Sequence, residues 1–138
     1  MNLPLMITDN ITELLVKIIE FAQIRQKILT RNINNVHSPG FVPKDLDVDE
    51  FRELLNSAID EHARSRRLLL RDTESIKFGT NGSFKVKPVA DKHAKELLEE
   101  NRDEYLKLQM DKLVENSLNQ RVAAELLKQK QGMISIFE

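Results

Sequence analysis

The positions of the helix-breaking residues are the feature that most constrains this 138-residue chain. Its four prolines stand at positions 4, 39, 43 and 88, and its four glycines at positions 40, 79, 82 and 132. They leave a few long uninterrupted pieces, of which the longest covers residues 89–131. Because proline and glycine interrupt helices more strongly than other residues, these pieces favour helices. The chain is therefore expected to be mainly α-helical.

In the first long piece, apolar residues recur at steps of three and four, which is the period of a helix with one buried face. The expected N-terminal helix covers residues 8–37. Its apolar stripe contains Ile11, Leu14, Leu15, Ile18, Ile19, Ala22, Ile28, Leu29, Ile33 and Val36. Thr8 or Asp9 is expected to cap the first turn, because a short oxygen-bearing side chain accepts the free amides there.

The end of this helix stands out because it holds three asparagines followed by a proline and a glycine. Asparagine is unfavourable inside a helix, but its amide offers both donors and an acceptor. Asn32 and Asn35 share a face with the apolar stripe, where a buried amide can fix the register of packing. Pro39 and Gly40 fit the central positions of a type II turn, so the helix is expected to end near residue 36 or 37. A turn segment over residues 38–48 follows.

A middle helix is expected over residues 49–71, where the same apolar spacing continues from Phe51 to Ala63. Acidic residues lie at its start and a cluster of arginines at its end, and both signs suit the helix dipole. The cluster consists of Arg64, Arg66, Arg67 and Arg71. These arginines either pair with the acidic residues of segment 43–61 or form a contact for an acidic partner or nucleic acid.

Residues 72–88 change to a period of two. Apolar residues alternate with polar ones on both sides of an Asn-Gly pair, as in a short β-hairpin. The alternating residues are Ile76, Phe78, Phe84 and Val86. Since two strands alone are marginal in water, this hairpin either packs on a helix or remains loosely ordered.

The last piece is expected to form one C-terminal helix over residues 89–135, with an apolar stripe from Leu97 to Leu127. A helix of that length exceeds the needs of a globule of this size. The fold class that we expect is therefore mainly α, with the long N- and C-terminal amphipathic helices packed antiparallel as in a coiled coil. The whole chain forms one domain, with six phenylalanines and one tyrosine for a thin core.

Several classes of function find no support in the sequence. With a formal net charge of -1, the chain as a whole does not attract the negatively charged backbone of nucleic acids as basic proteins do. There are no cysteines, the three histidines show no metal-ligand spacing, and no phosphate-binding loop or nucleophile motif is present. No apolar run approaches the length that crosses a membrane, and the first ten residues lack the basic start of a cleaved secretory signal. We expect no enzyme, no cofactor, no metal and no membrane insertion.

Residues 25–41 resemble the signature of the bacterial flagellar basal-body rod proteins, which reads roughly Asn-Ile-Ala-Asn-x-x-Thr-Pro-Gly-Tyr. Asn32, Ile33, Asn35, Pro39 and Gly40 match this signature here, and Asn34, Ser38 and Phe41 stand in place of its alanine, threonine and tyrosine. Residues 109–118 are similar to the Glu-Met-x-x-Leu-x-Glu-Asn segment of that family. The chain departs from the family near residues 101–105, where Asn-Arg-Asp-Glu-Tyr replaces the usual Gly-Asn-Asn-Val-Asp before the last helix. The short length is similar to that of the smallest rod proteins, which lack a large middle domain.

This resemblance implies a structural subunit of the proximal rod in the periplasm, exported through the flagellar type III apparatus without a cleaved signal peptide. Its partners would be other rod and basal-body proteins and itself. The assembly motif would comprise Asn32, Ile33, Asn35, Ser38, Pro39, Gly40 and Phe41. Ridges of the paired terminal helices would be buried between subunits. The expected helix-seam residues are Ile11, Leu15, Ile18, Ala22, Leu29, Met110, Leu113, Leu118 and Leu127.

Overall fold

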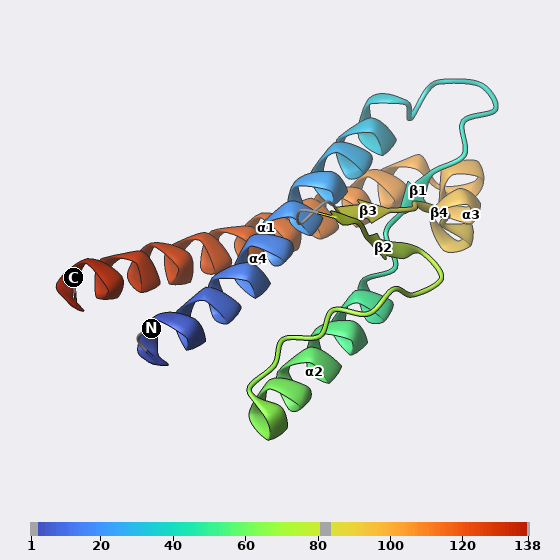
Figure 1. Ribbon diagram of the computed structural model, residues 1–138. Coiled ribbons are helices and arrows are strands. Elements are labelled where there is room, and N and C mark those ends of the chain that lie inside the picture. The colour runs from blue at the N-terminus through green and yellow to red at the C-terminus, as the bar shows by residue number, and fades with distance from the viewer. Residues whose placement is uncertain (1–2, 81–83, 138) are drawn as a thin grey trace.

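The computed structural model describes residues 3–80 and 84–137, and this part of the chain is mainly helical (Figure 1). Its helices are α1 (Leu3–Asn34), α2 (Val48–Ser65), α3 (Lys92–Glu100) and α4 (Arg102–Phe137). Its strands are short: β1 (Lys44–Asp45), β2 (Ile76–Phe78), β3 (Phe84–Val86) and β4 (Val89–Ala90). Within these residues no helix is both long and apolar enough to cross a membrane.

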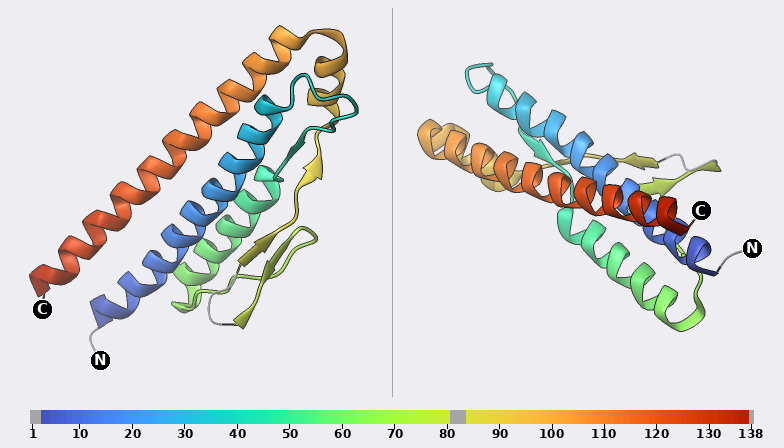
Figure 2. Two further views of the ribbon diagram at one scale, coloured as in Figure 1. Left: turned by 90° about the horizontal axis from the view of Figure 1, so that it is seen from above. Right: turned by 90° about the vertical axis from the view of Figure 1, so that its left-hand side faces the viewer.

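The two long helices, α1 and α4, pack antiparallel along most of their lengths, as the sequence predicted. Both termini consequently lie at the same end of the molecule (Figure 2). The turn after α1 and the junction between α3 and α4 lie at the opposite end. Helix α2 and the hairpin lie on the far side of α1 from α4, so the molecule is elongated around the helix pair.

Helix α1 has different ends from the predicted helix 8–37. It begins at Leu3, so the predicted caps Thr8 and Asp9 lie inside it. Pro4 stands in its first turn, where the missing amide hydrogen bond costs nothing. It ends at Asn34. The Val36 amide donates to the carbonyl of Ile33, three residues earlier, at 3.3 Å, and this tighter turn replaces the four-residue hydrogen-bond spacing of the α-helix.

The predicted type II turn follows the helix. The Phe41 amide donates to the Ser38 carbonyl at 3.2 Å, which closes the four-residue turn. Gly40 has a φ of +72°, which the third position of such a turn requires and which other residues rarely adopt. The chain then runs into β1, which pairs antiparallel with β4 through Lys44–Ala90 and Asp45–Val89.

Helix α2 begins as expected but ends at Ser65 instead of residue 71. Asp47 caps its start by accepting from the Glu50 amide at 2.9 Å. At its end, Arg66 adopts a left-handed conformation with φ 63° and donates its amide to the His62 carbonyl. The reversal returns the extended chain along the helix, which lets Leu70 pack against the core.

The predicted single helix over residues 89–135 is wrong, because this region forms β4, α3 and α4. Asp91 caps α3 by accepting from the Ala94 amide at 3.1 Å. Asn101 has extended backbone angles that end α3, and its side chain accepts from the Glu104 amide at 3.2 Å to cap α4. Aspartate and asparagine are strong N-cap residues. They therefore set the start of α3 and the start of α4 without a proline or a glycine.

The hairpin is confirmed, with Ile76 opposite Val86 and Phe78 opposite Phe84. Its expected turn over residues 81–83 lies outside the described residues. The hairpin packs on the helices: the Phe84 ring lies 6.2 Å from the Phe51 ring between centroids. A small core surrounds these contacts and contains Phe21, Leu46, Phe51, Leu54 and Ile76.

Candidate assembly surfaces and the polar seam

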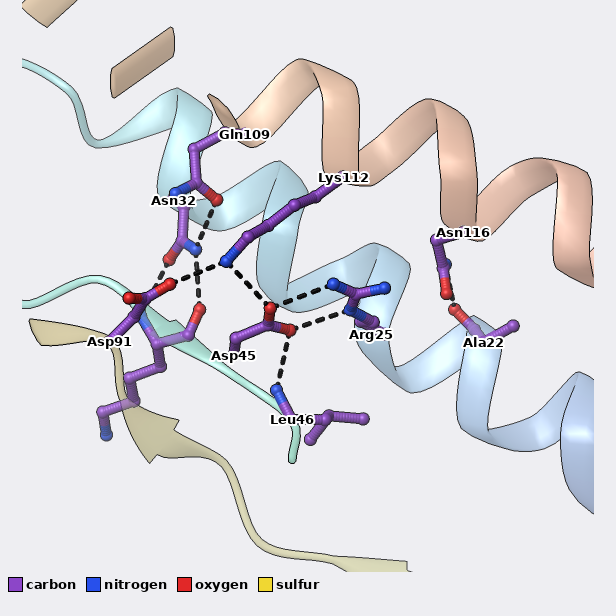
Figure 3. A network of polar contacts seen from close by, with 10 residues as sticks. Ala22, Arg25, Asn32, Asp45, Leu46, Asp91, Gln109, Lys112 and Asn116 are labelled. Carbon is purple, nitrogen blue, oxygen red and sulfur yellow. Dashed lines mark hydrogen bonds and ion pairs between the residues drawn. The ribbon is translucent and has the colours of Figure 1, made fainter. Parts of the chain in front are cut away.

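The seam between α1 and α4 has a polar centre. Asn32, 1% exposed, donates its amide to the Lys44 carbonyl at 2.7 Å and to Gln109 Oε1 at 2.9 Å (Figure 3). The Lys44 backbone amide returns a hydrogen bond to Asn32 Oδ1 at 3.2 Å. One buried side chain thus joins α1, β1 and α4, and a shifted register would leave its partners unsatisfied.

A buried ionic cluster lies beside this polar centre. Its residue on α1, Arg25, is two helical turns from Asn32, and its residue on α4, Lys112, is one turn from Gln109. The Arg25 guanidinium donates two hydrogen bonds to the Asp45 carboxylate, at 2.9 and 3.1 Å. From α4, Lys112 Nζ reaches Asp45 at 3.1 Å and Asp91 at 2.7 Å. Burial alone would raise the pKa of Asp45, but Arg25, Lys112 and the Leu46 amide outweigh it and lower this pKa below its usual value.

Further contacts fix the two helices at separate points along the seam. Asn116 Nδ2 donates to the Ala22 carbonyl at 2.7 Å (Figure 3). The Tyr105 hydroxyl donates to the Asn32 carbonyl at 2.8 Å. Each bond joins a polar side chain of α4 to a backbone carbonyl of α1. The inner face of α4 therefore combines apolar side chains with polar ones, and the hydrogen bonds of the polar ones specify one alignment of the helices.

We predict that Tyr105 titrates near pH 12 in the folded protein. Burial, and then the charge of Asp91, raise its pKa from 10.0 to about 12. The chain has one tyrosine and no tryptophan, so the ultraviolet absorbance of tyrosinate reports this residue alone. The neutral phenol stabilises the fold fully below pH 10, and this stabilisation is lost as the pH rises through 12. A midpoint near 10 while circular dichroism still shows native helix would contradict the prediction.

Of the two asparagines expected in the seam, only Asn32 lies there. Asn35 instead holds the turn: its Nδ2 donates to the Arg31 carbonyl at 2.8 Å, and its Oδ1 accepts from the Ser38 hydroxyl at 2.9 Å. Ile33 and Phe41 are half-buried, while Ser38, Pro39 and Gly40 are exposed. The assembly motif thus divides into one seam residue and an exposed turn.

The predicted helix-seam residues also divide. On α1 these residues are buried or half-buried within the chain itself: Ile11, Leu15, Ile18, Ala22 and Leu29. On α4, Leu113 and Leu127 are half-buried, but Met110 and Leu118 are 57% and 55% exposed. The two exposed residues do not lie between α1 and α4. The sequence pattern does not indicate the side chains that α4 buries within residues 102–132, which are Tyr105, Gln109, Asn116 and Ala123.

Among the residues of α4 whose side chains are described, 102–132, the large exposed apolar ones form one row. They are spaced four residues apart, and their exposures range from 44% to 60%. We call this row the outer ridge, and it consists of Met110, Val114, Leu118, Val122 and Leu126. Helix α4 packs mainly on α1, with α3 near its start, and no other element lies along its outer side (Figure 2). Residues at this spacing form the ridges with which helices pack into the grooves of other helices.

The arginine cluster does not form one helix face. Arg64 pairs with Glu61 in α2 at 2.7 Å, Arg66 occupies the left-handed position, and Arg67 and Arg71 lie beyond the helix. The pairing with acidic residues that the sequence allowed is thus present for Arg64.

The histidines are scattered. His37 and His93 are exposed, and His62 is half-buried with its Nε2 atom unpartnered. In residues 3–80 and 84–137, no group of three histidine, aspartate or glutamate residues is arranged to hold a metal ion.

The chain matches no protein-family model, no curated protein and no solved structure. Its class is therefore defined by its own architecture, a mainly α fold built on an antiparallel pair of long helices. Two features distinguish that pair of helices. Polar side chains form hydrogen bonds between α1 and α4, and an apolar ridge is exposed on the outer side of α4.

Proposed function

We propose that this chain is a structural subunit of the bacterial flagellar basal-body rod, in its proximal part, and that it assembles through its paired terminal helices. The outer ridge is the observation that supports this proposal. The proposal includes the partners and the location that the resemblance implies: other rod and basal-body proteins and further copies, in the periplasm, after type III export. It assigns no catalytic role and no cofactor.

Helix α4 departs from the usual arrangement for a monomer, because it buries polar side chains and also exposes a row of large apolar ones. A surface helix normally buries its apolar stripe and exposes its polar face. Here Gln109 and Asn116 face the partner helix inside the chain, while Leu118 and its ridge neighbours face out. Contiguous exposed apolar residues commonly mark a surface that another protein covers. This arrangement supports a subunit whose α4 is enclosed on both sides after assembly.

The size of the ridge supports an assembly with several contacts. Full burial of one such side chain contributes about 1.5–3 kcal/mol, and these side chains are already about half-buried. Five of them cover far less than the about 800 Å² per partner of a typical stable interface. The ridge therefore fits one contact among several around a subunit, as in a helical tube, better than a lone dimer interface.

The test is a triple variant, Val114→Thr, Leu118→Gln and Val122→Thr, which makes the centre of the ridge polar and keeps its shape. We expect self-association, and binding to a second rod protein, to weaken by about tenfold or more, because the apolar area that drives them is lost. Sedimentation velocity and pull-down measure this. Since the three side chains are exposed, circular dichroism should show an unchanged fold.

The matched control removes exposed apolar surface elsewhere, with Ile59→Gln and Val89→Thr, which are 52% and 43% exposed. This control should associate like the wild type. Equal association of the triple variant and the wild type would reject the outer ridge as an assembly surface.

A further inference from the structure

A cleft of about 870 Å³ lies at the end of the molecule opposite the termini. One wall is the turn segment after α1, and the other is the junction between α3 and α4. Its apolar lining comes from Val36, Phe41, Val42 and Leu98. Its charged lining comes from Lys95, Glu99, Glu100, Arg102 and Asp103.

The cleft lacks the features of a small-molecule site. Such sites place a few convergent polar groups in a mostly enclosed apolar pocket. Among the described residues, the buried side-chain polar atoms without a partner belong to Thr12, His62 and Gln109, and none of these residues lines the cleft. Its charged residues Glu99, Glu100 and Asp103 are exposed. An open cleft whose lining combines apolar side chains with exposed charges, three of them acidic, fits a protein segment better.

The C-terminal end of α4 has the complementary chemistry. The charged residues that line the cleft comprise two basic side chains, Lys95 and Arg102, and three acidic ones, Glu99, Glu100 and Asp103. Residues 121–131 carry three basic and one acidic. After them the sequence becomes apolar, with Met133, Ile134, Ile136 and Phe137, and the backbone stays helical to Phe137. The end of α4 is thus basic and then apolar, as an occupant of this cleft must be.

We propose that the cleft receives the C-terminal end of α4 from a second copy of the chain, so that copies join head to tail. This inference rests on the proposed function: the outer ridge would provide contacts between neighbouring rows of subunits, and the cleft the contact along a row. The cleft and the C-terminal end of α4 differ in chemistry and lie at opposite ends of the molecule (Figure 2). Such a heterologous contact leaves a free cleft at one end and a free helix at the other, so it extends instead of closing.

A charge exchange tests the contact. The head variant carries Glu99→Lys and Glu100→Lys, and the tail variant carries Lys128→Glu and Lys130→Glu. Alone, each variant brings like charges together and should associate about tenfold more weakly than the wild type. Mixed, the two variants present opposite charges at every contact, so association should return in an alternating copolymer. Sedimentation velocity at low and high salt measures both results.

The matched control for the head variant is Glu53→Lys with Asp60→Lys, which makes the same charge change on exposed positions of α2. It should associate like the wild type. The inference is overturned if head and tail variants associate normally, if their mixture fails to recover, or if the wild type stays monomeric at all concentrations. If the outer-ridge variant loses association while the head and tail variants associate normally, the head-to-tail contact is rejected and the proposed function still stands. Normal association of all variants would reject both.

Discussion

Replacing Asp45 by asparagine is expected to lower the free energy of unfolding by about 3–5 kcal/mol at pH 7. Its carboxylate is 12% exposed and accepts from Arg25, whose side chain is 7% exposed, and from Lys112. Asparagine preserves the shape and the hydrogen bond from the Leu46 amide, but it removes the negative charge. Two cations from different helices then face a neutral group in a site with little water. Urea denaturation measures the loss.

An exposed ion pair provides the control for this prediction. Asp49 accepts from Arg52 at the same 2.9 Å as Asp45 from Arg25, but its side chain is 85% exposed. Asp49→Asn should therefore cost under about 1 kcal/mol, since water already screens the pair. Similar losses at the two positions would show that the Asp45 cluster stabilises the fold no more than a surface pair does.

The pH dependence of the Asp45 cluster has a definite sign. The pKa of Asp45 is lowered in the folded chain from its usual 3.8. Its contribution to stability is therefore fully present above pH 3.8 and is lost as the pH falls through the lowered native value. The stability difference between the wild type and Asp45→Asn should shrink on acidification. A difference that stays constant from pH 7 to pH 2 would contradict the electrostatic origin of the effect.

The helical architecture could be predicted from the sequence because it depends on local patterns. Apolar residues at helical spacing gave the two long helices, and Pro39 with Gly40 gave the turn. The errors lie where a boundary depends on side-chain capping instead of a breaker. Asn101 ends one helix and starts the next through its own backbone angles and side chain, without proline or glycine. Arg66 reverses the chain in a conformation that no local pattern assigns to arginine.

The seam was only partly predictable, for a different reason. Asn32 could be found because three asparagines in a helix need an explanation. On α4, the apolar spacing marks Met110 and Leu118 as helix-seam residues, because burial usually follows hydrophobicity. The structure buries Gln109 and Asn116 instead, because each finds a partner 77 or 94 residues away. Such partners are set by the three-dimensional packing, and no periodicity within one helix contains them.

The second large effect is expected at Asn32, where Asn32→Asp should lower the free energy of unfolding by about 3 kcal/mol at pH 7. The wild-type amide donates to the Lys44 carbonyl and to Gln109 Oε1. A carboxylate of the same shape has no hydrogen to donate, so acceptors face acceptors in a site that is 1% exposed. Rotation of the Gln109 amide supplies one donor, but the Lys44 carbonyl cannot change its role.

The pH dependence of Asn32→Asp should be opposite to that of Asp45. Burial among acceptors raises the pKa of the introduced carboxyl above its unfolded value, so the protonated form is stabilised on folding. The variant should therefore approach the wild type in stability below the unfolded pKa and lose stability as the pH rises through the raised one. Asn119→Asp on exposed α4 is the matched control and should change stability by at most about 0.5 kcal/mol. If the deficit of Asn32→Asp were as large at pH 4 as at pH 7, the loss would come from packing, and the amide of Asn32 would not be what aligns α1, β1 and α4.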